Sequence, residues 1–245
     1  MGFLLRQFRA LGECDLPNTV TLDGKPYRLK STFKHNFISA VGVYRHAADT
    51  VVCKYYRDAP FFGLPLRPFG RLLAAYESAV LRRVDDIEGV PEFRGRPSQT
   101  ALARQFVPGT PLLRGSAVDD EFFPLLLRLL ERIHERGIAY VDLEKAENIL
   151  QGDDGRPHLI DFQIAFYVPV RLGGHALAVR WIRECLQRAD RYHVLKHFRR
   201  SRPDQLGEDG LADSRRKPLP VRLGNRLIAP WKRLRRAVLR RGKEK

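Results

Sequence analysis

The feature that most constrains the fold is a change of sequence pattern near residue 108. Before it, segments rich in β-branched and aromatic residues are separated by turn residues, which is typical of strands. After it, apolar residues recur at the spacing of a helix. The sequence therefore predicts an α+β fold with a β-rich first part and a mostly helical second part. Strands are expected over residues 26–33, 37–44, 50–56 and 101–107, and helices over 70–84, 121–136 and 175–197.

The predicted organisation has three parts. Residues 1–108 form the β-rich part, which contains antiparallel strands that begin near residue 26 and one helix. Residues 109–198 form a reduced helical part, and residues 199–245 form a linker and a basic tail. A length of 245 residues suits one domain with two lobes.

Basic charge is concentrated at the C-terminal end of the chain. The 44 Lys and Arg against 28 Asp and Glu give a formal charge of +16. Residues 215–245 hold thirteen Lys or Arg and one acidic residue, a net charge of +12, which leaves +4 for the other 214 residues. Because +4 is ordinary for a soluble domain, the basic character belongs to the tail rather than to the fold.

Residues 223–241 predict a basic amphipathic helix within the tail. Leu227, Trp231, Leu234 and Val238 recur at steps of four, three and four, and Lys and Arg occupy the positions between them. Such a helix is typical of binding to an anionic membrane surface. Docking on the body of the protein remains an alternative. Nucleic acid is a weaker one, because the tail offers a single aromatic residue for stacking.

Three further features bound the class of protein. No run reaches the ~18 uncharged apolar residues that a membrane-spanning helix needs. Cys14, Cys53 and Cys185 lie far apart without a CxxC pair, which argues against a disulfide scaffold or a zinc site. The first residues lack the apolar run of a signal peptide. We therefore expect a cytoplasmic protein that associates peripherally with the inner face of the cell membrane.

The residues that carry chemistry follow the helix predicted over 121–136. Asp142 and Asn148 frame a short loop, and Asp161 ends a short strand thirteen residues after Asn148. Phosphoryl transfer from a nucleotide uses one carboxylate to orient the attacking hydroxyl and accept its proton. It also uses an amide and a second carboxylate to hold Mg²⁺ on the phosphates. The three residues supply this set.

On these residues the chain resembles the protein-kinase-like superfamily, closest to compact bacterial branches such as RIO-type kinases and lipopolysaccharide core sugar kinases. The run from Tyr140 through Asp142 to Asn148 resembles the H-R-D-L-x-x-x-N motif, and Asp161-Phe162-Gln163 resembles D-F-G. The resemblance covers about residues 27–170. It implies that Asp142 is the catalytic base and that Asn148 and Asp161 are Mg²⁺ ligands.

In the first part, the resemblance assigns two residues to the phosphates of ATP. Lys54 matches the lysine of the V-A-I-K motif, which steadies the α- and β-phosphates. Glu77, in the helix that follows, is its expected ion-pair partner. Glu88 and Glu92 are competing candidates for that role.

The same resemblance places the adenine-binding hinge at residues 105–109. Backbone groups of Gln105 and Val107 would then cradle the base. Gly42 stands alone in residues 37–45, where a kinase carries a glycine-rich loop. Binding of phosphates by backbone amides is therefore the least supported part of the predicted site.

The catalytic loop also departs from the family pattern. The step from Asp142 to Asn148 is six residues where the motif has five. Either Glu144 or Lys145 therefore occupies the position next to the transferred phosphate, and Lys145 is preferred because its charge suits that position. The His-Arg pair of the motif is absent, and Gln163 replaces the glycine of D-F-G.

The resemblance implies an ATP- and Mg²⁺-dependent kinase that phosphorylates a hydroxyl. The acceptor is a protein Ser/Thr or a lipid-linked sugar such as lipopolysaccharide core. A missing A-P-E motif and the basic tail favour the membrane-associated acceptor. The alternative is a pseudokinase, a nucleotide-binding or scaffolding module tethered to an anionic surface by its tail. The altered motifs favour that alternative, whereas retention of Asp142, Asn148 and Asp161 favours an active enzyme.

Overall fold

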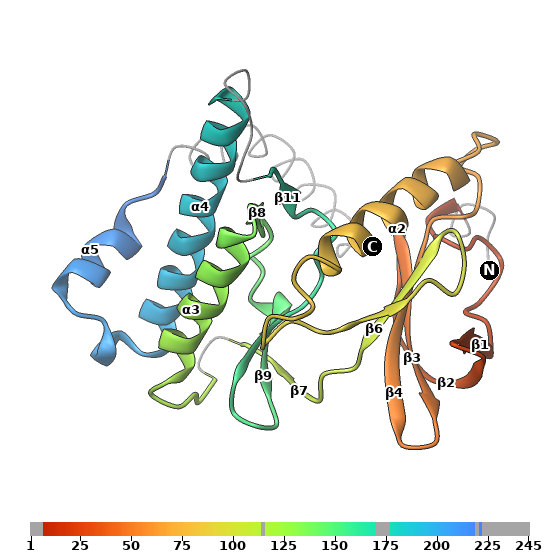
Figure 1. Cartoon of the computed structure of the whole chain (residues 1–245), viewed down its shortest axis with the longest axis horizontal. Helices are drawn as coiled ribbons and strands as arrows, with labels where there is room; N and C mark the ends of the chain where they lie inside the picture. Colours follow the sequence, from red (N-terminus) through yellow and green to blue (C-terminus); the bar gives the residue numbers. More distant parts are fainter. Residues whose placement is uncertain (1–6, 114–115, 170–176, 219–220, 222–245) are drawn as a thin grey trace, which may run out of the picture. The chain divides into compact units, whose positions relative to one another are not determined.

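The computed structural model describes residues 7–113, 116–169, 177–218 and 221. The chain divides into two compact units, each with its own packing (Figure 1). The first comprises residues 1–112 and 147–165, and the second residues 113–146 and 166–245. The helix predicted over 223–241 lies outside the described residues. No helix in the described part of the chain combines the length and the apolar character needed to span a bilayer.

The first unit is built on a six-stranded antiparallel sheet with the order β1-β2-β3-β4-β6-β5. The predicted strands are confirmed, whereas β1 and β5 were not anticipated because they are only four and three residues long. The turn at Asp23-Gly24 has φ of 49° and 74°, the left-handed values of a tight two-residue hairpin. The strands are β1 (Thr19–Leu22), β2 (Lys25–His35), β3 (Ser39–His46), β4 (Asp49–Tyr56), β5 (Phe93–Gly95) and β6 (Ala101–Gln105).

The sheet buries a hydrophobic core on one of its faces. Tyr27, Ala40, Tyr44 and Cys53 are among its members. Burial raises the pKa of the Cys53 thiol to about 12, so this residue packs as an apolar side chain. Because side chains alternate along a strand, the next residue of β4, Lys54, belongs to the opposite face.

Helix α2 (Arg67–Leu81) packs against β4 and β6 (Figure 1). It begins and ends three residues before the predicted 70–84, since Pro68 suits the first turn of a helix. Gly70 permits close packing there: a Cβ atom would lie 2.0 Å from the carbonyl oxygen of Arg57. The buried face of the helix includes Glu77 and so presents this carboxylate to the sheet.

A second, three-stranded sheet with the order β10-β9-β7 also belongs to the first unit. It joins β7 (Gly109–Pro111) to β9 (Ile149–Gly152) and β10 (Pro157–Leu159). The prediction assigned these strands to the helical part, residues 109–198. The difference arises because β7 pairs with a strand forty residues later, and sequence spacing does not reveal such a pairing.

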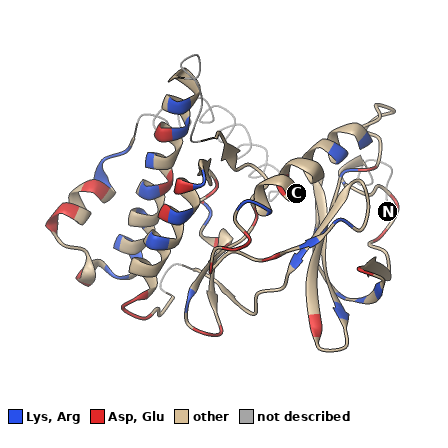
Figure 2. Ribbon diagram, in the orientation of Figure 1, with Lys and Arg blue, Asp and Glu red and all other residues tan. Residues whose placement is uncertain are grey.

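The second unit is mainly helical. Helix α3 (Phe122–Glu135) packs against α4 (Leu177–Ser201), and β8 (Ile138–Ala139) pairs with β11 (Phe166–Tyr167). Gly137, with φ of 77°, follows the end of α3 and has the left-handed backbone of a glycine C-cap. Charged residues of both signs are spread along the ribbons of α3 and α4 (Figure 2).

The predicted linker over 199–218 instead contains a helix, α5 (Glu208–Arg215), packed on α4. Two acidic residues in its first turn favour a helix start. Arg199 Nη1 contacts both the carbonyl oxygen and the hydroxyl of the buried Ser214 at 3.3 Å. This anchor explains why a segment rich in Pro, Gly and Asp is nevertheless ordered against the helix.

Candidate active site

Lys54 is the centre of a buried ion network in the first unit. Its Nζ lies 3.0 Å from Oε2 of Glu77 and 2.6 Å from Oδ1 of Asp161. Lys54 is 5% exposed and Glu77 is 1% exposed. Since water screens such contacts little, the network holds the three side chains in one geometry. The structure thus places Glu77, rather than Glu88 or Glu92, against Lys54.

The two competing glutamates have other partners. Glu88 pairs with Arg156, and Glu92 Oε2 lies 3.0 Å from Nη1 of Arg94. Both glutamates are exposed to solvent. Only tertiary structure separates them from Glu77, which α2 carries into the interior.

Tyr56 adds a second donor to the network. Its hydroxyl donates a hydrogen bond to Glu77, and its ring centroid lies 5.1 Å from the Nζ of Lys54. Burial, aided by the charge of Glu77, raises the pKa of Tyr56, so the hydroxyl keeps its proton and remains a donor. The sequence carries one signal for this role: Tyr56 stands two residues after Lys54 and shares its face of β4.

A cavity of about 500 Å³ lies beside the network. This volume is within the range of small-ligand sites. Val41, Val52, Leu150 and Ile160 supply apolar walls. Three cations and three carboxylates also line it: Lys34, Lys54, Arg104, Glu77, Glu147 and Asp161. The three positive and three negative charges of the lining cancel, so the cavity suits an anionic ligand that binds together with a cation of its own.

Asp161 faces this cavity with an unusual backbone. Its φ is 69°, a left-handed value that persists in non-glycine residues only where the surroundings impose it. Burial alone would raise the pKa of Asp161. The charges of Lys54, Lys34 and Arg104 outweigh burial and hold that pKa below its usual range, so the carboxylate is ionised at neutral pH.

Asn148 lies on the same cavity and is 6% exposed. Its carbonyl oxygen accepts a hydrogen bond from the Ile160 amide at 3.0 Å, which fixes the residue before Asp161 beside Asn148. Carboxylate and amide oxygens suit Mg²⁺, which takes one or two protein ligands together with phosphates and water. The described residues contain no group of three or more His, Cys, Asp or Glu that could hold a metal ion. One amide and one carboxylate on the same cavity match the few protein ligands that Mg²⁺ takes when it binds together with phosphates.

The segment after Asp161 is held against α2. Phe162 is fully buried, and the Tyr76 hydroxyl donates to the carbonyl oxygen of Ala165 at 2.6 Å. Gln163 is half-buried. Gln163 stands where the D-F-G motif has glycine, and these contacts leave the segment less backbone freedom than that glycine would give.

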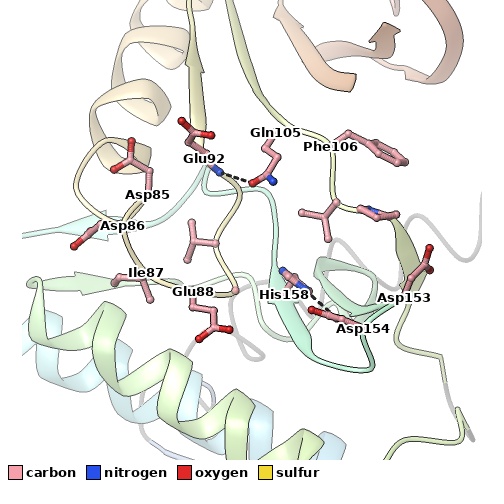
Figure 3. Close-up of a pocket in the computed structure, with 14 residues that line it drawn as sticks. Asp85, Asp86, Ile87, Glu88, Glu92, Gln105, Phe106, Asp153, Asp154 and His158 are labelled. Carbon is pink, nitrogen blue, oxygen red and sulfur yellow. Dashed lines mark hydrogen bonds and ion pairs between the residues drawn. The ribbon is translucent and has the colours of Figure 1, made fainter. Parts of the chain in front are cut away.

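Of the two predicted hinge residues, only Val107 lines the cavity described above. Both residues line a second hollow of about 460 Å³, where Oε1 of Gln105 accepts from the backbone amide of Glu92 (Figure 3). The backbone amide of Gln105 donates to the Glu92 carbonyl oxygen at 2.8 Å. This second hollow is strongly acidic, with Asp85, Asp86, Glu88, Glu92, Asp153 and Asp154 around it.

In the second unit, Asp142 and Lys145 form an ion pair, with Nζ 2.7 Å from Oδ2. Lys145, one of the two residues considered for the phosphate position, therefore contacts Asp142. The residue before Asp142, Val141, has φ of 71°, a genuine outlier for a β-branched side chain. Such a backbone needs support from its surroundings.

Asp190 of α4 provides that support. Its two carboxylate oxygens accept from consecutive backbone amides, those of Tyr140 at 2.7 Å and Val141 at 2.8 Å. Asp190 is completely buried, and burial raises its pKa despite the opposing contacts with these amides and with His134. Sequence reasoning missed Asp190. The signal available in the sequence was that Asp190 occupies an inward-facing position of the helix predicted over 175–197.

His197 fixes the other side of the loop. Its Nε2 lies 2.8 Å from the carbonyl oxygen of Leu143. His134 of α3 has its Nε2 3.2 Å from Oδ2 of Asp190. Both histidines belong to the frame of the Asp142 loop.

The predicted residues thus fall into two described sets. Lys54, Glu77, Val107, Asn148 and Asp161 line one cavity of the first unit. Asp142 and Lys145 pair within the second unit.

No protein-family model matches the sequence, and no curated protein matches it. Solved structures do resemble the chain. Two are crystal structures of the Rio2 kinase from Chaetomium thermophilum, one of them an ADP/Mg²⁺–phosphoaspartate complex. Both have a TM-score of 0.50, with 19% and 17% sequence identity over 70% and 71% of this chain.

The chain has a two-lobed protein-kinase-like α+β fold. It spans 56% and 58% of the length of the two Rio2 chains. At such identity the likeness shows the fold alone. What the chain does must be argued from its own residues.

Proposed function

We propose that this chain is an ATP- and Mg²⁺-dependent phosphotransferase whose acceptor is a hydroxyl group. The observation that carries the proposal is the buried network of Lys54 with Glu77 and Asp161, in a cavity that Asn148 also lines. A surface salt bridge contributes little to stability, and a buried one often contributes no more than apolar packing would. A buried lysine held by two carboxylates at a ligand-sized cavity is better explained by a binding role.

Each residue of the first unit has a proposed task. Lys54 binds the α- and β-phosphates, and Glu77 orients it. Asp161 and Asn148 hold Mg²⁺, which when bound neutralises charge on the phosphates. Backbone groups at Val107 cradle the base. Gln105 acts through its backbone or not at all, since its side chain faces the second hollow.

The proposed task of Asp142 is to orient the acceptor hydroxyl and accept its proton. Lys145 beside it would stabilise the carboxylate and meet the transferred phosphate. Because phosphoryl transfer requires little covalent work from the protein, holding these charges in place is most of the catalytic task.

The acceptor is a protein Ser/Thr or a lipid-linked sugar such as lipopolysaccharide core. Residues 223–241 would bring the enzyme to an anionic membrane surface at the inner face of the cell membrane. Deleting residues 215–245 should then abolish binding to vesicles that contain anionic lipid at low salt. Retained binding would refute this role of the tail.

The deciding experiment is thermal melting of the full chain with ATP, with and without Mg²⁺, beside Asp161→Ala. A ligand that binds the folded state raises the melting temperature. We expect a Mg²⁺-dependent rise in the parent that is lost in Asp161→Ala. The absence of any rise in the parent would overturn the proposal.

A second candidate function is a pseudokinase that binds nucleotide without transfer. The pairing of Lys145 with Oδ2 of Asp142 favours it, because that oxygen is already engaged and so less available to an acceptor hydroxyl. Asp142→Asn distinguishes the two candidates. For an enzyme, this change should abolish phosphoryl transfer to water or an acceptor and leave ATP binding unchanged.

A further inference from the structure

The turn between β2 and β3 opens residues 37–45, the segment where the resemblance to kinases places a glycine-rich loop. In kinases that loop covers the phosphates of ATP. Here Oδ1 of Asn36 accepts from the amides of Ile38 at 3.0 Å and Ser39 at 2.9 Å. The amide of Asn36 in turn donates to the carbonyl oxygen of Ser39 at 3.0 Å. Three backbone donors of the turn are thus engaged within the turn itself.

The carbonyl groups of this turn are also engaged. The Arg57 amide donates to the Ile38 carbonyl oxygen at 2.8 Å, and Nη1 of Arg57 donates to that of Phe37 at 3.0 Å. The Arg57 guanidinium also lies 4.1 Å from the centroid of the Phe37 ring. Arg57 is fully buried. Arg57 therefore holds the turn from the protein interior, and the backbone groups of the turn are poorly suited to bind phosphates.

A β-bulge just before the turn places a cation on the cavity instead. Thr32 of β2 pairs with Gly42, and in unbroken register Lys34 would pair with Ala40. Ala40 belongs to the hydrophobic core on the other face. The register shifts between Thr32 and Lys34, so Lys34 pairs with Val41, which lines the cavity. Bulges often re-aim a side chain in this way beside functional sites.

Lys34 consequently shares a row with the buried lysine of the site. Val41 pairs with Lys34 on one side and with Lys54 on the other, and all three residues line the cavity. Within the described part of the chain, no carboxylate lies at ion-pair distance from Lys34. Lys54, by contrast, is already held by Glu77 and Asp161.

We propose that Lys34 binds the phosphates of the nucleotide in place of the backbone amides of a glycine-rich loop. This inference rests on the proposed function and assigns a residue that the kinase motifs do not contain. A polyphosphate needs positive charge beyond a lysine already paired with two carboxylates. The exposed ammonium of Lys34 is a flexible point charge suited to that task.

The test compares nucleotide and nucleoside binding by the full chain. Dissociation constants for ATP and for adenosine, both with Mg²⁺, are measured by calorimetry for the parent, Lys34→Ala, Lys34→Arg and Lys30→Ala. Lys30 is an exposed lysine of the same strand that does not line the cavity, so it controls for a general loss of charge.

We expect Lys34→Ala to bind ATP about tenfold more weakly, the size of one charge-assisted contact. Its affinity for adenosine should match that of the parent. Lys34→Arg should restore most of the ATP affinity, and Lys30→Ala should bind ATP like the parent. The difference between parent and Lys34→Ala should also shrink at high salt, since the lysine is exposed.

Either of two results overturns the proposal for Lys34 and leaves the proposed function untouched. One is unchanged ATP affinity in Lys34→Ala, and the other is an equal loss of ATP and adenosine affinity in that variant. The second result would mean that Lys34 shapes the cavity rather than binding phosphate. A parent that binds neither ligand would overturn the proposed function as well, which keeps the two failures distinguishable.

Discussion

The frame of the Asp142 loop offers the sharpest test of how this structure works. Asp190→Ala removes the carboxylate that accepts from the amides of Tyr140 and Val141. The Tyr140 amide is buried and Val141 is half-buried. The substitution also removes the support for the left-handed backbone at Val141.

The magnitude follows from these contacts. A buried donor left without an acceptor costs about 1–3 kcal/mol. Water reaches the half-buried Val141 amide in part, so we expect Asp190→Ala to lower the free energy of unfolding by about 2–4 kcal/mol. Asp190→Asn keeps one acceptor oxygen but turns an amide donor toward the second backbone donor. Its loss should be about half as large.

Urea unfolding followed by circular dichroism measures these losses, with Asp213→Ala as the control. Asp213 is an exposed carboxylate on α5, and its removal should change stability by less than about 0.5 kcal/mol. If transfer activity is present, folded Asp190→Asn should lose kcat with little change in the KM for ATP, because Asp190 frames Asp142 rather than the Lys54 cavity. Equal stability of Asp190→Ala and Asp213→Ala would refute this reasoning.

Two further predictions concern groups that burial controls. Tyr56→Phe removes a hydrogen-bond donor from the buried Glu77 and should lower the free energy of unfolding, measured in urea, by about 1.5–3 kcal/mol. Tyr27→Phe is the control and should lower it less, because the Tyr27 hydroxyl bonds the more exposed Asp49. Equal losses in the two variants would contradict the buried network. Burial lowers the pKa of His193 to about 4. At mildly acidic pH the unfolded chain therefore binds a proton on His193 that the native state does not bind. Protonation then favours the unfolded chain, so the free energy of unfolding decreases as pH falls from about 6.5 to 4. Between pH 7 and pH 5 the parent should lose about 2 kcal/mol more than His193→Gln, and parallel losses would show that His193 titrates normally.

Local patterns were sufficient to predict the elements that depend on nearby residues. Strands β2, β3, β4 and β6 and helix α3 all follow from residue periodicity and propensity. The pairing of β7 with β9 and the helix α5 did not, because each depends on a partner distant in the sequence.

The same division holds within the candidate site. Motif spacing singled out Lys54, Asn148 and Asp161, since a reaction that needs a base, a metal and a phosphate clamp requires particular residue types. It ranked Glu77 first among three glutamates, but only the direction of the α2 face separates Glu77 from the other two.

The sequence by itself determined which chemical groups this protein can offer to a nucleotide. Tertiary structure alone decided which further groups stand beside them. Lys34 faces the cavity because of a one-residue shift in strand register, and Tyr56 reaches Glu77 because α2 packs on β4. Asp190 meets the Asp142 loop because α4 packs on β8. These placements depend on pairing and packing between distant segments, which no local pattern in the chain records.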